Sequence, residues 1–204
     1  MGWPKIYPLV QLIIKPTDYA RSKFGPSGPT GVTVHYTADG SVQGAIDSFA
    51  KDGYCYHLII GRDGKVTQTC YMDSGTWHAG KALWLGQSPN KSHIAVALVS
   101  WGWLEPDGLG GWESYAKTKV PGNEVAFRPS NLNAKQQAWH AATPEQETAL
   151  DHVLLWAITN GISPDAICGH DEAALPLGRK SDPGGVLSRT MPELRAHLVS
   201  SSSA

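Results

Sequence analysis

The pattern of hydrophobic and polar positions predicts two strands in the first half of the chain. Residues 32–37 alternate between apolar and polar and are rich in β-branched side chains, which is typical of a strand with one covered face. Val32, Val34 and Tyr36 fall on one face of this strand and Thr33, His35 and Thr37 on the other. Residues 94–99 are apolar at every position, which favours a strand buried on both faces in the centre of a sheet.

A hairpin is predicted between these two strands. Residues 54–60 and 65–71 flank Gly61-Arg62-Asp63-Gly64, and the Asp-Gly step favours a tight turn. Tyr56 and His57 fall on opposite faces of the first strand of the hairpin, so only one of them can face a given site.

Three segments carry helix signals. Ser41 is a typical N-cap for a short amphipathic helix that ends before Gly53. Residues 143–146 combine a threonine cap, a proline at the first helical position and a glutamine that completes a capping box, and the helix they begin continues to Asn160-Gly161. A last short helix is predicted from Thr190 to about Val199.

The remaining segments show no sustained period. We expect residues 101–142 to form a long excursion over the surface that walls one side of a cleft, and we assign no secondary structure there. Residues 200–204 are expected to be a disordered tail. The elements together predict one α/β domain over residues 1–199, with a core of about 31–199, in which helices cover a mixed central sheet.

Composition excludes some classes of partner. The chain has 204 residues, a formal net charge of −1 and 17% charged residues, so it lacks the basic field of a nucleic-acid binder. Three cysteines make no disulfide framework, although Cys55 and Cys70 can pair across the hairpin if its register allows. The apolar run at residues 9–14 is too short for a signal peptide or a membrane span, so we expect a protein that begins in the cytoplasm and has no membrane partner.

The segment 167–185 is the strongest candidate for a functional site. It places the chemically active side chains between glycines and prolines: His170, Asp171, Glu172, Lys180 and Asp182. Imidazole and carboxylate groups suit a catalytic zinc ion, which needs three protein ligands and an open position for water. This segment offers two ligands, so a third must come from elsewhere; the alternative is a polar surface loop. His35, near the carboxyl end of its strand, is a candidate or a packed histidine.

Five motifs, in this order, resemble the zinc-dependent N-acetylmuramoyl-L-alanine amidases, which include the phage amidase-type lysozymes and share their fold with peptidoglycan recognition proteins. The resemblance covers roughly residues 32–198. The motifs are VHYTA at 34–38, YHLIIGRDGKV at 56–66, WHAG at 77–80, the threonine-proline helix start at 143, and GHDEAA with RKSDPGG within 169–185.

The resemblance implies a role for each matching residue. His35, His170 and Asp182 match the zinc ligands of the family. Lys180 matches a catalytic lysine that stabilises the oxyanion, and Tyr56 matches a tyrosine that assists through the zinc-bound water.

Three further residues receive supporting roles. We assign His78 and Trp77 of the WHAG motif to substrate binding and expect Asp171 to be the hydrogen-bond partner of a ligand histidine.

One position departs from the family pattern. Many relatives carry a glutamate in the central strand where this chain has Ala97, so the resemblance implies the mechanism that uses Tyr56 and Lys180 instead of a glutamate base. The source of the proton for the leaving amine stays open.

The resemblance implies a zinc amidase that cleaves the bond between N-acetylmuramic acid and L-alanine in peptidoglycan. A monomeric phage endolysin, made in the host cytoplasm and acting on the cell wall after release, is the expected setting. The alternatives are a cytoplasmic amidase that recycles muropeptides and a peptidoglycan-binding module without catalysis. A structural zinc site is disfavoured, because such sites normally have four protein ligands, mostly Cys or His.

Overall fold

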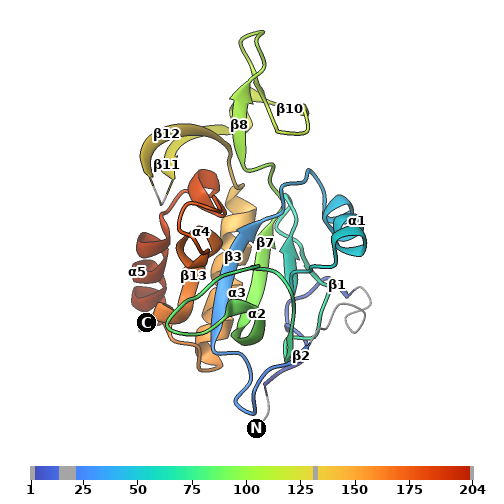
Figure 1. The fold of residues 1–204 in the computed structure, drawn as a ribbon, viewed down its shortest axis with the longest axis vertical. Helices are drawn as coiled ribbons and strands as arrows, with labels where there is room; N and C mark the ends of the chain where they lie inside the picture. Colours follow the sequence, from blue (N-terminus) through green and yellow to red (C-terminus); the bar gives the residue numbers. More distant parts are fainter. Residues whose placement is uncertain (1–2, 14–21, 131–132, 203–204) are drawn as a thin grey trace.

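The computed structural model describes residues 3–13, 22–130 and 133–202, and two sheets dominate it (Figure 1). The central sheet has six strands in the order β1-β5-β4-β7-β3-β13. These strands are β1 (Leu12–Ile13), β3 (Gly31–Tyr36), β4 (Leu58–Ile60), β5 (Val66–Gln68), β7 (His93–Leu98) and β13 (Ile167–Gly169). A small separate ladder pairs β2 (Ser22–Lys23) with β6 (Ser74–Gly75).

The central sheet is mixed, as the sequence predicts. β3 runs parallel to both β7 and β13, β4 runs parallel to β7, and only β4 and β5 pair antiparallel, as the predicted hairpin. The hairpin strands are shorter than predicted, covering residues 58–60 and 66–68. Every residue of β7 is buried, which confirms its predicted central place.

Helices cover both faces of the central sheet. α3 (Pro144–Thr159) and α5 (Met191–Ser202) pack on the face that carries Val32 and Val34, whereas α1 (Val42–Asp52) packs on the opposite face. The predicted caps are confirmed. The Ser41 hydroxyl accepts a hydrogen bond from the Gly44 N–H, and Thr143 and Gln146 form a reciprocal capping box. The remaining helical turns are short: α2 (Pro89–Ser92), α4 (His170–Ala173), η2 (Pro164–Ala166) and η3 (Gly184–Val186).

The last helix continues beyond its predicted end. α5 includes Ser200 and Ser202, which corrects the expectation of a disordered tail from residue 200; residues 203–204 lie outside the described part. No glycine or proline interrupts the helix here, and the Ser200 and Ser202 hydroxyls donate to the His197 and Val199 carbonyls of the preceding turn.

The excursion after β7 forms a second sheet, where we predicted no secondary structure. Its five antiparallel strands lie in the order β10-β9-β8-β12-β11, and the β8–β10 part projects from the body (Figure 1). The elements are β8 (Trp103–Pro106), β9 (Trp112–Glu113), β10 (Lys119–Val120), η1 (Gly122–Glu124), β11 (Val125–Ser130) and β12 (Asn133–His140). Three of the strands have only two to four residues, too few for an alternating pattern to stand out in the sequence.

The second sheet is attached to the body through Trp139. This ring is fully buried, and a Cβ added at Gly184 or Gly185 would lie 2.4 Å from it. Glycine is therefore required for this close approach. The Arg128 guanidinium adds hydrogen bonds to the carbonyls of Gly185 and Val186. The sheet thus supports the turn that directly follows Asp182.

Cys55 and Cys70 are both buried thiols, so the disulfide considered from the sequence is not formed. Within the described residues, no helix has both the length and the apolar character needed to cross a membrane.

Candidate metal centre and catalytic cleft

Three predicted metal ligands converge at one edge of the central sheet. His35 lies near the carboxyl end of β3, and His170 begins α4 directly after β13, the parallel neighbour of β3. Asp182 follows on the loop after α4. Its Oδ2 lies 2.7 Å from Nδ1 of His35 and 2.9 Å from Nδ1 of His170. One ligand atom from each residue lies within 4.8 Å of the others, so the three side chains can hold a single metal ion.

The hydrogen bonds of the two histidines determine their tautomers. His170 Nε2 lies 2.9 Å from the Ala79 carbonyl, which can only accept, so Nε2 carries the proton. His78 Nε2 likewise donates to the Pro89 carbonyl at 3.2 Å, so the Nδ1 of a neutral His78 accepts from His35 Nε2 at 3.0 Å. In both ligand histidines, Nδ1 is the ring nitrogen that faces Asp182.

The electrostatics of the three groups favour a bound cation. Burial lowers the pKa of His35 to about 4 and holds the pKa of His78 well below its usual value, so both rings are neutral near pH 7. Burial opposes ionisation of Asp182, yet its contacts with His170 and His35 hold the pKa of the carboxyl well below its usual range. Two imidazole nitrogens and a carboxylate oxygen thus face one another, and this set of donor atoms fits zinc.

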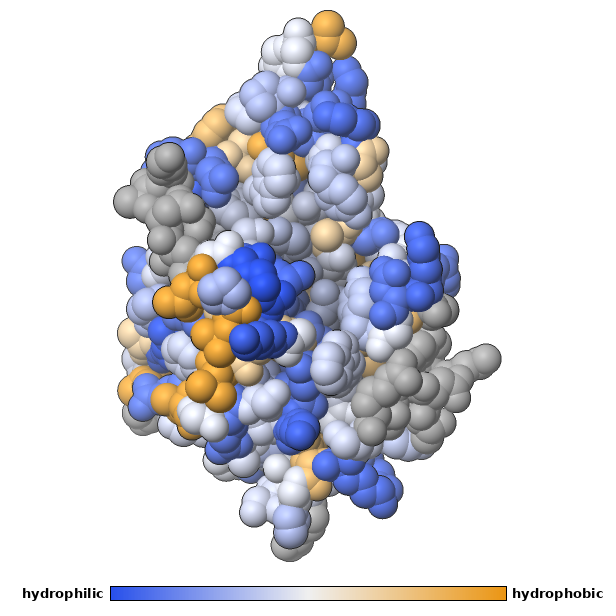
Figure 2. Space-filling model, in the orientation of Figure 1, coloured by the Kyte–Doolittle hydropathy of each residue, from blue (hydrophilic) through white to orange (hydrophobic). Residues whose placement is uncertain are grey.

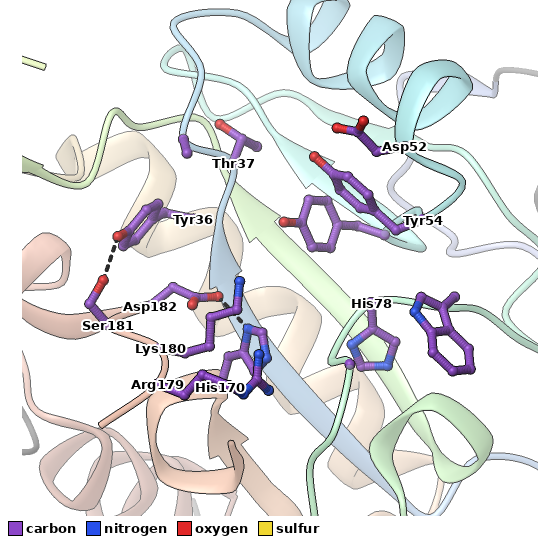
Figure 3. A pocket seen from close by; sticks show the side chains of 14 residues that line it. Tyr36, Thr37, Asp52, Tyr54, His78, His170, Arg179, Lys180, Ser181 and Asp182 are labelled. Atoms are coloured by element: carbon purple, nitrogen blue, oxygen red, sulfur yellow. Dashed lines mark hydrogen bonds and ion pairs between the residues drawn. The ribbon is translucent and has the colours of Figure 1, made fainter. Parts of the chain in front are cut away.

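A cleft of about 430 Å³ opens onto these ligands (Figure 3). All four predicted catalytic and substrate-binding residues line it: Tyr56, Trp77, His78 and Lys180. Its walls come from residues 36–56, 77–80 and 170–182. None of the lining residues comes from the 101–142 excursion, although we expected that segment to wall the cleft.

Tyr56 and Lys180 lie beside the ligands. The Tyr56 ring is 4.9 Å from the His35 ring, and burial raises its pKa well above the usual value, so the phenol keeps its proton. The positive charge of Lys180 is close enough to contribute to the lowered pKa of His35. Tyr56 therefore offers a neutral hydroxyl donor beside the ligands, and Lys180 offers a positive charge.

The contacts of His78 indicate a role besides the substrate binding that we predicted, which stays a prediction. It lines the cleft, but only 6% of it is exposed and both ring nitrogens are already hydrogen-bonded, one of them to His35. This geometry is typical of a residue that orients a metal-binding histidine, here His35. Trp77 is 56% exposed in the same wall and can contact a substrate.

The role expected for Asp171 as the partner of a ligand histidine stays a prediction. The ring nitrogens of both ligand histidines bond to Asp182, His78 and Ala79. The backbone of Asp171 supports the site, because its N–H donates to the Asp182 carbonyl at 2.7 Å.

Asn90 supports the site and was missed in the sequence. Its side-chain oxygen accepts the N–H groups of His78 and Ala79, and its NH₂ group donates to the Gly80 carbonyl. One amide thereby fixes the loop that carries His78. We interpreted Asn90 only as a turn residue, because a local pattern does not reveal contacts with residues ten to twelve positions earlier.

Arg179 and Tyr36 were also missed. Arg179 donates to the carbonyls of Ala79, Lys81 and Leu175 and lines the cleft next to Lys180. The Tyr36 hydroxyl lies 2.7 Å from the hydroxyl of Ser181, the residue that separates Lys180 from Asp182 in the sequence. The only available signal for Tyr36 was its place beside His35 at a strand end.

The structure confirms that no carboxylate occupies the central-strand position discussed above. Ala97 on β7 is the register partner of His35, and it is fully buried. A glutamate base at this position is therefore absent.

Comparison with known proteins identifies the family. The model of the N-acetylmuramoyl-L-alanine amidase family matches residues 25–185, and no curated protein sequence matches. A selenomethionine derivative of AmpD has a TM-score of 0.58 and 20% identity, covering 96% of this chain and 98% of that one. AmiD from E. coli has a TM-score of 0.60 and 21% identity over 88% of this chain and 60% of its own.

The endolysin amidase LysCS from Clostridium intestinale URNW has a TM-score of 0.56 and 17% identity, with 96% and 98% of the two chains covered. At these identities the structures show a shared fold, and the family match shows the chemistry. The chain therefore belongs to the N-acetylmuramoyl-L-alanine amidase family and is an enzyme that hydrolyses the amide bond between N-acetylmuramic acid and L-alanine.

Proposed function

We propose that this amidase is zinc-dependent and acts on intact cell-wall peptidoglycan, in the manner of an endolysin. The observation that carries the proposal is the convergence of two histidine nitrogens and one carboxylate in a cleft that also contains Lys180. A zinc ion held there would activate a water molecule near pH 7 and polarise the amide carbonyl. One chain supplies all three ligands, so the site is complete in a monomer.

The residues around the ligands have distinct tasks in this proposal. Lys180 stabilises the negative charge that develops on the amide oxygen. Tyr56 donates a hydrogen bond from a phenol that stays protonated, since burial raises its pKa. Asp182 keeps its negative charge and, with His35 and His170, completes the three-ligand set. His78 orients His35 through the Nε2–H to Nδ1 hydrogen bond.

The charge at one end of the cleft suits the stem peptide. Arg179 and Lys180 line this end. AmiD was solved with anhydro-N-acetylmuramic acid-L-Ala-D-gamma-Glu-L-Lys, a ligand whose γ-linked glutamate leaves one carboxylate free. We propose that the peptide of the substrate extends toward Arg179, because its guanidinium can pair with that carboxylate while Lys180 faces the amide oxygen.

The second candidate is an amidase that recycles soluble muropeptides. The likeness to AmpD, which covers nearly all of both chains, favours it as much as the likeness to LysCS favours an endolysin.

The test is peptide release from purified sacculi and from a soluble anhydromuropeptide, measured as new L-alanine amino groups. We expect release from sacculi that stops when a chelator removes the metal and returns when zinc is added. Release from the soluble substrate alone would replace the endolysin proposal with the recycling one. Tight zinc binding without release from either substrate would contradict both the endolysin and the recycling proposal.

A further inference from the structure

The two ends of the catalytic cleft differ in charge. Figure 3 shows Arg179 and Lys180 at one end, beside His170 and Asp182, and Asp52 and Tyr54 at the other. The second end carries a carboxylate and no cation among the described residues that line it. Burial raises the pKa of Tyr54, and the negative charges of Asp52 and Asp39 raise it further. An anionic stem peptide is disfavoured there, whereas the hydroxyl groups of a neutral sugar can donate to Asp52.

The projecting second sheet reaches back to this acidic end through one tyrosine. Tyr115 lies in the turn between β9 and β10, and its hydroxyl donates to the Ala38 carbonyl at 3.1 Å. Ala38 lines the cleft, and Tyr115 is close enough to Tyr54 to influence its pKa. The Tyr115 side of the turn therefore adjoins the Tyr54 end of the cleft.

This turn holds Tyr115 in a defined position. The Ser114 hydroxyl accepts the N–H groups of Ala116 and Thr118, and the Ser114 N–H donates to the Thr118 carbonyl. The Trp101 ring packs edge-on against Tyr115 with ring centres 6.2 Å apart, and it also covers Gly40, where an added Cβ would lie 2.9 Å away. Tyr115 is nevertheless 61% exposed. Because this exposed ring is already held in place, a ligand can cover it at little cost in conformational entropy.

We propose that Tyr54, Tyr115 and Asp52 form a subsite for the N-acetylated sugar that neighbours the muramic acid in a glycan strand. The apolar face of a pyranose packs on an aromatic ring, and its hydroxyls bond to a carboxylate at the edge. The inference rests on the proposed amidase function, because it extends the same cleft. It predicts that the enzyme distinguishes polymeric glycan from a single-sugar muropeptide.

The surrounding surface supports a sugar as the occupant. Figure 2 shows mainly hydrophilic groups on the projecting sheet, with separate apolar groups at its tip and along its side; the continuous apolar band on this face lies lower, away from the projection. An apolar partner would need a continuous apolar patch. A glycan strand needs hydrogen-bonding groups with a few aromatic rings, which is the composition of this end of the cleft.

The experiment compares kcat/KM for three substrates with the same peptide: an anhydromuropeptide with one sugar, its disaccharide form, and a longer glycan chain. For the native enzyme we expect kcat/KM to rise with chain length. In Tyr115→Ala the ratio of the long to the single-sugar substrate should fall roughly tenfold, the size expected for loss of an aromatic contact.

Two further variants distinguish a contact with the sugar from a purely structural role of Tyr115. Tyr115→Phe removes the bond to Ala38 but keeps the ring, so it should keep most of the preference for long substrates. Phe127→Ala removes another exposed ring, 60% exposed on β11 and outside the cleft lining, and should leave the ratio at the native value.

Three outcomes would overturn the inference: a native enzyme that does not prefer longer chains, an unchanged ratio in Tyr115→Ala, or an equal loss on all three substrates in both the Ala and the Phe variant. The last outcome would show that Tyr115 only stabilises the local structure through its hydrogen bond to Ala38. Failure of the native enzyme on every substrate would instead refute the proposed function, so the two failures are distinguishable.

Discussion

The two sheets of this enzyme contribute to the site in different ways. The central strands β3 and β7 are almost wholly buried and parallel, and β3 and β13 deliver His35 and His170 at adjacent strand ends. The second sheet has short, partly exposed antiparallel strands and supplies no residue to the cleft lining. It acts from outside, through Trp139 behind the Asp182 loop and through Tyr115 at Ala38. The buried central sheet therefore positions the ligand histidines. The second sheet supports the loop that carries Asp182 and contacts the rim of the cleft.

The largest loss of activity is expected when one of the three metal ligands at the end of the central sheet is removed. Asp182→Ala should reduce peptide release to background, because two neutral histidines alone hold zinc weakly. Activity and bound zinc are measured on the same preparation. Native-like activity in the variant would mean that the site at the end of the central sheet is not the catalytic one.

Lys180→Ala should lower kcat by about 10²–10³-fold, the size expected for loss of one group that stabilises an oxyanion. Zinc content should stay native, since Lys180 is not a ligand. Lys81→Ala, which removes a nearby exposed cation outside the cleft lining, is the matched control. Near-normal turnover by Lys180→Ala would remove this residue from the mechanism.

His78→Ala should weaken zinc binding about 10–100-fold, as is typical when the partner of a ligand histidine is lost. The reason is that His35 loses the acceptor that keeps its proton on Nε2. Competition with a chelating dye gives the affinity, and His152→Ala, on the exposed face of α3, is the control. If affinity is unchanged while KM rises, His78 is a substrate contact, as the sequence alone suggested.

Trp139→Phe tests the support from the second sheet. The change removes the indole N–H that donates to the Arg128 carbonyl at 2.9 Å and leaves space beside Gly184 and Gly185. We expect a loss of about 1–2 kcal/mol in the free energy of unfolding by urea. Trp103→Phe, at the paired position on β8 and 38% exposed, should cost less than about 0.5 kcal/mol. Equal costs would contradict a special role for Trp139.

The smallest effect concerns pH. Burial lowers the pKa of His57 and of His93 to about 4, below the value of about 6.5 in an unfolded chain. The unfolded state therefore binds protons first as pH falls, so stability is full above about pH 6.5 and is lost toward pH 4. Each histidine should cost about 1 kcal/mol between pH 7 and 5.5.

The check is the free energy of unfolding of zinc-loaded protein at these two pH values. His93→Gln should show a smaller difference between the two pH values than the native chain does. An equal difference in both proteins would show that His93 titrates normally in the folded state.

Elements with strong local signals could be predicted from the sequence. The caps at Ser41 and Thr143 and the apolar run of β7 depend on neighbouring residues alone, so they were predicted close to their observed positions. The grouping of His35, His170 and Asp182 came from the order of family motifs, since nothing local joins residues 147 positions apart.

The second sheet and the supporting contacts could not be predicted. Strands of two to four residues show no measurable alternation, and their stability comes from distant contacts such as Trp139 against Gly185. The roles of His78 and Asn90 likewise depend on which atoms meet in the folded chain: a histidine in a loop offers no sign that both of its nitrogens are already bonded.

The central claim is that two histidines and one aspartate hold a catalytic zinc ion. X-ray absorption spectroscopy of the zinc-loaded enzyme tests it most directly. The account predicts two imidazole nitrogens and one or two oxygens at about 2.0–2.2 Å, with one position left for water. A sulfur ligand at about 2.3 Å, or a closed set of four protein ligands, would contradict it.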